Sequence, residues 1–146
     1  MASTPNTSTA IPIGLADPHA VEQQGRSTEF EWEITNDGKG HRRLAVLRVG
    51  FQKAGINYSN YQRHPTQFTA SLRNEDEDKT GSLPTRSYWG LSGIGICQQE
   101  ATRFSRKALA TFAEVALKTL KERYAAGDTA ILAHFHADEP TSPEGD

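Results

Sequence analysis

One short stretch, residues 28–35, constrains the fold of this chain more than any other part of its sequence. Apolar and acidic side chains alternate strictly within it, which is the pattern of a β-strand with one buried and one solvated face. Such a strand is typical of an antiparallel sheet that is covered on one side only. The apolar set is Phe30, Trp32 and Ile34, and the acidic set is Glu29, Glu31 and Glu33.

Further strands are expected between segments rich in turn-forming residues. Residues 36–40, with the sequence NDGKG, tolerate positive φ and predict a hairpin turn directly after the first strand. The acidic run at residues 75–78 is interpreted as the solvated tip of another hairpin. The further strands are expected at residues 42–53, 66–74 and 83–91.

A helix is predicted at residues 99–126, because apolar side chains recur there at helical spacing and Gly127 is suited to end it. The apolar run at residues 129–135 leaves room for one more short strand. Strands followed by a helix predict an α+β fold, with a four- or five-stranded antiparallel sheet packed on one long C-terminal helix. The predicted core consists of Phe30, Trp32, Ile34, Leu47, Val49, Phe68, Leu72, Phe112, Ala116 and Leu120.

The two ends of the chain differ in composition from its middle. Residues 1–26 lack apolar periodicity, and residues 138–146 contain two prolines and four acidic residues. We expect both ends to be disordered tails around a single α+β domain at residues 27–137. Residues 27–126 carry fifteen Lys and Arg against eleven Asp and Glu, a net +4, while the ends carry one Arg against seven acidic residues, a net −6. This division fits an anionic partner with a competing tail, or simply solvated ends.

The sequence also bears on the compartment. Cys97 is the only cysteine, so no intrachain disulfide can form, which fits a reducing environment. The first residues lack the basic start and apolar segment of a secretory signal. No apolar stretch approaches the ~20 residues that a membrane-spanning helix needs. We therefore expect a cytoplasmic protein without a membrane partner.

Residues 131–139, with the sequence ILAHFHADE, form the sharpest local motif. The motif resembles the HxHxDH segment of metallo-β-lactamase-fold hydrolases, which implies a strand that presents His134 and His136 on one side to a zinc ion. Glu139 stands where that segment has its final histidine, and only seven residues follow to supply further ligands. We therefore expect no metal site and no cofactor, and a metal-dependent hydrolase is the least favoured function.

Cations and aromatic residues lie on and beside the predicted strands. Cations that follow phosphates and rings that stack on bases allow proteins to bind single strands without reading sequence. The order of four strands and one helix is also similar to that of the PC4-like, Whirly and Pur families of single-stranded nucleic acid binders. This analogy of element order implies the same class of ligand. The candidate binding residues are Arg42, Arg43, Arg48, Tyr58, Tyr61, Arg73, Arg86, Tyr88 and Trp89.

Two other interpretations stay open. The arginines can instead pair with Glu29, Glu31 and Glu33 across the strands, and the same surface can dock a protein. The chain has no complete set of acid, base, nucleophile or metal ligands, so we expect a non-enzymatic binding module rather than an enzyme. Single-stranded DNA or RNA is the expected partner, and a protein-protein adaptor or a homo-oligomeric assembly subunit is the alternative.

Overall fold

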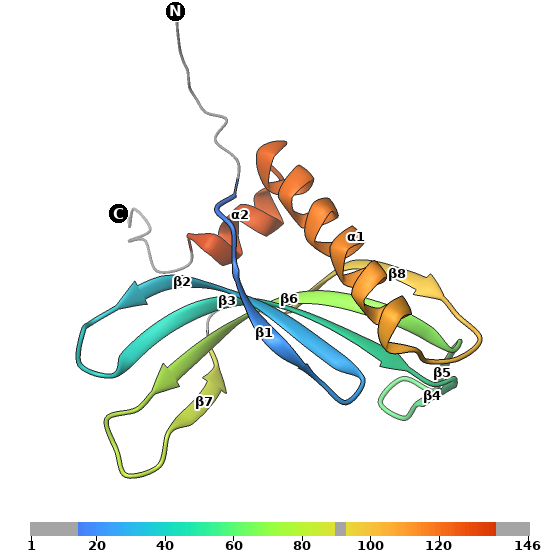
Figure 1. The fold of residues 1–146 in the computed structure, drawn as a ribbon, viewed down its shortest axis with the longest axis horizontal. Coiled ribbons are helices and arrows are strands. Elements are labelled where there is room, and N and C mark those ends of the chain that lie inside the picture. Colours follow the sequence, from blue (N-terminus) through green and yellow to red (C-terminus); the bar gives the residue numbers. More distant parts are fainter. Residues whose placement is uncertain (1–14, 90–92, 137–146) are drawn as a thin grey trace, which may run out of the picture.

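The computed structural model in Figure 1 describes residues 15–89 and 93–136. An antiparallel sheet packs against a C-terminal helix, so the predicted α+β fold is confirmed. The strands are β1 (His19–Gln24), β2 (Ser27–Asn36), β3 (His41–Gln52), β4 (Gly55–Asn57), β5 (Gln62–His64), β6 (Gln67–Asp78), β7 (Thr85–Tyr88) and β8 (Ile94–Glu100), and the helices are α1 (Arg106–Ala125) and α2 (Thr129–Phe135).

The main sheet is a meander with one interruption. Strands β1, β2, β3 and β6 lie side by side in that order, and all their pairings are antiparallel. Strands β7 and β8 both pair with β6. Strand β7 pairs with residues 75–78 of β6, and β8 pairs with residues 67–72 of β6. The hairpin β4–β5 connects β3 to β6 and forms its own two-stranded sheet. Both helices lie on one side of the main sheet (Figure 1).

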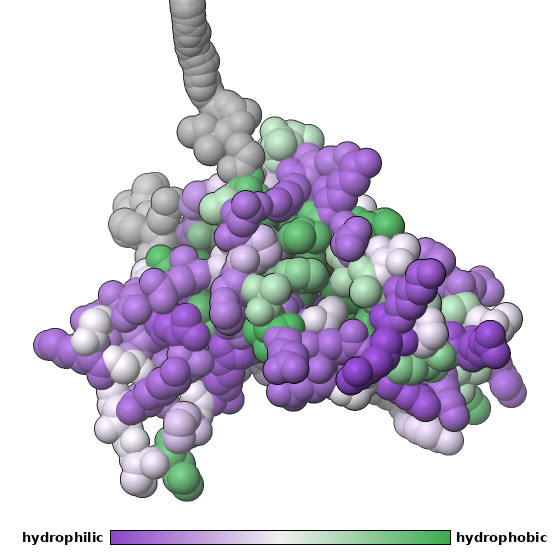
Figure 2. Space-filling model, viewed as in Figure 1, coloured by the Kyte–Doolittle hydropathy of each residue, from purple (hydrophilic) through white to green (hydrophobic). Residues whose placement is uncertain are grey.

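The core lies between α1 and the sheet. The rings of Phe68 and Phe112 stack there, with centroids 5.7 Å apart. Phe30 and Ile34 are half-buried against the core, and the other eight predicted core residues are buried, so the predicted core is confirmed. The apolar surface visible in Figure 2 is concentrated where α1 meets the sheet, and hydrophilic residues cover much of the flanks.

The side of the sheet away from the helices, which we name the open face, is defined by the strand register. Glu31 of β2 pairs with Val46 of β3, and Val46 pairs with Arg73 of β6, so these residues share that side. Leu44 lies two residues from Val46 on the same side, and both are fully buried. The open face therefore has Leu44 and Val46 at its centre, flanked by charged side chains from both ends of β3 and from the neighbouring strands.

The N-terminal boundary of the domain differs from the prediction. Residues 19–24, which the sequence assigned to a tail at residues 1–26, form β1 and pair with β2. Ahead of β1, Leu15 packs against the core, and the Trp32 indole N–H donates to the Ala16 carbonyl (2.8 Å). The domain thus begins well before residue 27. Residues 1–14 and the predicted tail at residues 138–146 lie outside the described residues.

Three predictions for the second half of the chain are wrong. The helix predicted at residues 99–126 begins only at Arg106, because residues 94–100 form β8. Ser105 is the N-cap of α1, and its Oγ accepts the Ala108 N–H (3.0 Å). Residues 129–135 form α2 and not a strand, because Asp128 accepts N–H groups of the first turn. The acidic run at residues 75–78 lies inside β6 and not at a hairpin tip.

Candidate nucleic-acid interface

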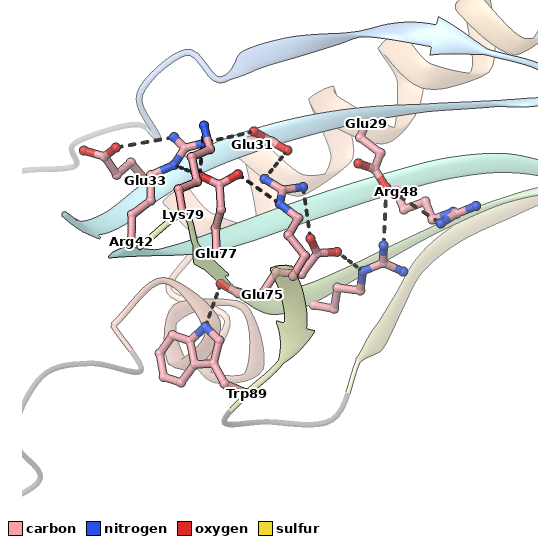
Figure 3. A network of polar contacts seen from close by, with 11 residues as sticks. Glu29, Glu31, Glu33, Arg42, Arg48, Glu75, Glu77, Lys79 and Trp89 are labelled. Carbon is pink, nitrogen blue, oxygen red and sulfur yellow. Dashed lines mark hydrogen bonds and ion pairs between the residues drawn. The ribbon is translucent and has the colours of Figure 1, made fainter. Parts of the chain in front are cut away.

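An ion-pair network covers the half of the open face next to the β2–β3 turn (Figure 3). Its centre is Arg86 of β7. The Arg86 guanidinium contacts Glu31 (Nη2–Oε2 2.7 Å) and Glu75 (Nη1–Oε1 3.1 Å). It also contacts Glu77 (Nε–Oε2 3.2 Å), whose second oxygen accepts the Nε–H of Arg42 (2.5 Å). One arginine from an edge strand therefore joins three carboxylates from two other strands.

Arg73 extends this network along β6. Its Nε lies 2.6 Å from Glu75 Oε2, and its Nη2 lies 3.3 Å from Glu29 Oε2. Its guanidinium also lies over the ring of Tyr88, 5.0 Å from the centroid. Arg48 is held more loosely, with its Nη1 3.8 Å from Glu29 Oε2 and 48% of its side chain exposed.

The carboxylates of this network are buried, so the arginines that neutralise them are needed for the stability of the fold. Glu31, Glu75 and Glu77 are each at most 7% exposed, and an uncompensated charge at such a site costs several kcal/mol. The hydrogen bond from Arg42 keeps the pKa of Glu77 below its usual value despite this burial. Cross-strand pairing of the arginines, which the sequence left open, is therefore confirmed. A phosphate that reaches this half of the face has to compete with carboxylates already in contact.

Arg43 and Trp89, two other predicted binding residues, lie apart from this network. Arg43 precedes Leu44 of the open face, so its side chain points to the opposite side of β3. Its guanidinium lies 4.4 Å from the centre of the Trp89 ring, and its Nε lies 3.8 Å from Asp76 Oδ1. The indole N–H of Trp89 donates to the Glu75 carbonyl (2.9 Å; Figure 3). The ring of Trp89 is thus already stacked against a cation.

The other half of the open face, toward the β1–β2 turn, has a different character. A surface hollow of about 520 Å³ lies there, lined by small and hydroxylated side chains and by two arginines. None of the described residues that line it carries a carboxylate. The residues that give it this character are Arg26, Ser27, Arg48, Gly50, Thr69 and Ser71.

A second hollow, of about 570 Å³, adjoins the first at the end of the sheet, beside the start of α1. Arg26 and Phe51 line both hollows. The second hollow is also lined by Lys53, Arg103, Thr66 and Thr102, and no carboxylate occurs among its described lining residues. Within residues 15–89 and 93–136, the cations of Arg26, Lys53 and Arg103 have no ion-pair partner. We name the two hollows together the basic groove.

The hairpin β4–β5 follows Lys53 and carries two of the predicted aromatic residues. Tyr58 is 77% exposed and Tyr61 is 80% exposed. Tyr61 has φ of 57°, a left-handed conformation that is strained for a residue with a bulky side chain. The Asn60 side chain accepts the Gln62 N–H (3.0 Å) and so stabilises the turn that holds Tyr61 in this conformation. Two aromatic rings therefore project into solvent from the same short hairpin.

Sequence reasoning selected Arg48, Tyr58 and Tyr61 but missed Arg26, Lys53 and Arg103. A signal for Lys53 was present in the distribution of acidic residues. No Asp or Glu occurs between Asp37 and Glu75, while residues 38–74 contain seven Lys and Arg. Cations in such a segment have few local carboxylates to pair with. Arg26 and Arg103 lie outside it, and only the fold brings them to the same end of the sheet.

The histidine motif does not form the arrangement that a zinc hydrolase requires. His134 and His136 lie in and just after α2, so residues two apart do not point the same way as they do on a strand. His134 is buried, with its Nδ1 2.9 Å from the Ala130 carbonyl. No group of three or more potential metal ligands occurs in the described part of the chain. Burial also raises the pKa of the Cys97 thiol, which disfavours a reactive thiolate.

Comparison with protein-family models, with curated proteins and with solved structures gave no match. No helix among the described residues is long and apolar enough to cross a bilayer.

Proposed function

We propose that this chain is a non-enzymatic module that binds single-stranded nucleic acid at the end of the sheet. One observation carries the proposal. Arg26, Lys53 and Arg103 lack carboxylate partners among the described residues, and they lie at the end of the sheet from which the hairpin with Tyr58 and Tyr61 extends. Unpaired cations attract phosphates, and exposed rings stack on bases of any sequence.

The exposed tyrosines favour a single strand over a duplex. A base can stack on Tyr58 or Tyr61 only if its own face is free, which is the case in an unpaired strand. The arginines of the ion-pair network have a secondary part in this proposal, because each already contacts a carboxylate. Of the arginines predicted from the sequence, Arg48 fits a phosphate contact best, since it has one long ion pair and a half-exposed side chain.

We place this activity in the cytoplasm, where the free thiol of Cys97 fits a reducing environment. The alternative function, a protein-protein adaptor or homo-oligomeric assembly subunit, is favoured by the sheet edges. Strand β1 forms one edge of the sheet and β8 forms part of the other. Such edges can pair with a strand from another chain.

The test is fluorescence anisotropy with labelled oligo(dT) and oligo(U), titrated with the full-length protein over a series of salt concentrations. We expect micromolar or tighter binding at low salt, and a weaker signal for a DNA duplex. The logarithm of the affinity should fall with the logarithm of the salt concentration, with a slope of about −0.7 for each phosphate contact. Absence of binding to both oligonucleotides at low salt would exclude this function and leave the adaptor as the favoured one.

Two tyrosine variants test the stacking contact separately from the charge. Tyr58→Ala and Tyr61→Gly should each weaken oligo(dT) binding by roughly 1–3 kcal/mol. Tyr61→Gly should not lower the melting temperature, because glycine adopts positive φ without strain. Leu83→Ala is the matched control, since Leu83 is 77% exposed on the loop between β6 and β7. Equal affinities for the tyrosine variants and the Leu83 variant would contradict a role of the hairpin in binding.

A further inference from the structure

Arg26 lies between the two hollows of the basic groove, a position that the proposed function alone does not explain. One hollow lies on the open face and the other lies beside the start of α1, and Arg26 lines both. Resting on the proposed function, we infer that the sugar–phosphate backbone of the bound strand crosses the end of the sheet through this groove, and that Arg26 contacts two successive phosphates.

Arg26 is held in place by the backbone and by two aromatic rings. Gly25 has φ of +56° and allows the tight turn between β1 and β2. The carbonyl of Arg26 accepts the Phe51 N–H (3.0 Å). The guanidinium lies over the rings of Phe51 and Phe104, 5.6 Å from each centroid. These contacts fix the position of the cation before any ligand arrives.

The same contacts leave the hydrogen-bond donors of Arg26 available. Stacking on rings uses the planar face of a guanidinium, whereas its five N–H donors lie around its edge. No carboxylate among the described residues contacts Arg26. An arginine in this state suits a bidentate or bridging contact with phosphate oxygens.

The hollow on the open face can accept one phosphate. Ser27, Thr69 and Ser71 contribute hydroxyl groups, which commonly donate to phosphate oxygens. Gly50 adds no side chain to its floor, so the hollow stays open between the strands. Arg48 lies at its margin, and a phosphate can replace its 3.8 Å contact with Glu29 at little cost.

The hollow at the sheet end can accept the next phosphate. Lys53 and Arg103 supply two cations, and Thr102 supplies a hydroxyl group. The first turn of α1, which begins three residues after Arg103, contains no acidic residue to oppose an anion. Two adjoining sites that share one cation fit a ligand with repeated phosphates better than a single small anion.

The test compares salt slopes for oligo(dT) binding by full-length variants. Arg26→Met, Arg48→Met and Arg103→Met should each reduce the slope by about 0.7, because each removes one positive charge that neutralises phosphate. Arg26→Met should weaken oligo(dT) binding most at every salt concentration, because it alone removes hydrogen bonds to two phosphates. Lys118→Met is the matched control, since it removes one positive charge from an exposed position on α1 and should leave the slope unchanged. Arg26→Met should fold as the unaltered protein does, because methionine keeps an apolar contact with Phe51 and Phe104, and a thermal melt checks this.

The outcomes separate the path of the backbone from nucleic-acid binding itself. If the unaltered protein binds oligo(dT) and Arg26→Met has the same slope as Lys118→Met, the groove is not the path, although the proposed function stands. If Arg26→Met weakens binding no more than Arg48→Met and Arg103→Met do, Arg26 does not bridge two phosphates. Calorimetry with inorganic tripolyphosphate tests the groove without bases. Arg26-dependent binding of tripolyphosphate supports the two-phosphate site even if oligonucleotides do not bind, and no binding of either ligand overturns both proposals.

Discussion

Replacing Arg86 with methionine should destabilise the protein far more than its position on a short edge strand suggests. Strand β7 has only four residues, and all four are exposed, but the Arg86 side chain reaches three carboxylates on two other strands. Glu31, Glu75 and Glu77 are nearly buried, so none can recover full hydration when the cation is lost. Removing one partner of a buried ion pair typically costs 3–5 kcal/mol. Because 32% of the Arg86 side chain is exposed, we expect a loss of about 3 kcal/mol in the free energy of unfolding.

The dependence of this loss on pH identifies its electrostatic origin. In the unaltered protein the hydrogen bond from Arg42 and nearby cations, including Arg86, lower the pKa of Glu77. Glu77 therefore contributes stability above its usual pKa of 4.5, and this contribution disappears as the pH falls through the lowered value. In Arg86→Met the pKa of Glu77 should rise, so protonation should remove part of the penalty. The difference between the two proteins should be large at pH 7 and shrink below pH 4.5.

Urea unfolding followed by tryptophan fluorescence can measure both effects. Arg48→Met is the control, because it makes the same change on the same face at a residue with one long ion pair. It should cost less than about 1 kcal/mol. Equal losses for the two methionine variants would refute the reasoning, and so would a loss for Arg86→Met that stays constant between neutral and acidic pH.

Two further predictions concern the ends of the chain. A protein that starts at residue 15 should be as stable as the full chain. One that starts at residue 19 should lose about 1–3 kcal/mol in the free energy of unfolding, because the Trp32 N–H loses its acceptor at Ala16. Urea unfolding compares the two truncations, and identical midpoints would contradict this prediction. Removing residues 138–146 should tighten oligo(dT) binding at low salt, because four negative charges are lost. Anisotropy should show that this gain disappears at high salt, and an unchanged affinity at low salt would exclude competition by that segment.

The elements that the sequence predicted well are those with a long, strict pattern. The alternation around Trp32 identified β2, and the apolar stripe through Phe112 identified the body of α1. Strand β1 was not predicted because its sequence has almost no alternation of apolar and polar residues. Only Val21 and Gln23 of its six residues are partly buried, and backbone pairing with β2 holds the strand in place. An edge strand of this kind is determined by its neighbour and not by its own side chains.

Two errors near the helices have a common physical cause, which is the ambiguity of short apolar runs. Residues 129–135 contain too few turns for periodicity to separate a helix from a strand. The deciding group is Asp128, which caps the helix from outside the apolar run. In the same way, Ser105 sets the start of α1, and the residues ahead of it are free to form β8. Capping residues carried this information, and hydrophobic spacing did not.

The sequence does not show which of its cations are paired with carboxylates and which are not. A net charge of +4 for residues 27–126 gives no indication of which cations are neutralised. The register of β3 on β6 sets Arg42 opposite Glu77, which binds it, whereas Arg48 lies opposite Ser71, which cannot neutralise it. Residue type alone does not separate the two cases, so the candidate arginines include three whose carboxylate partners are nearly buried. Arg26, Lys53 and Arg103, which have no carboxylate partner among the described residues, can meet an anion without first breaking an ion pair, and they lie together in the basic groove.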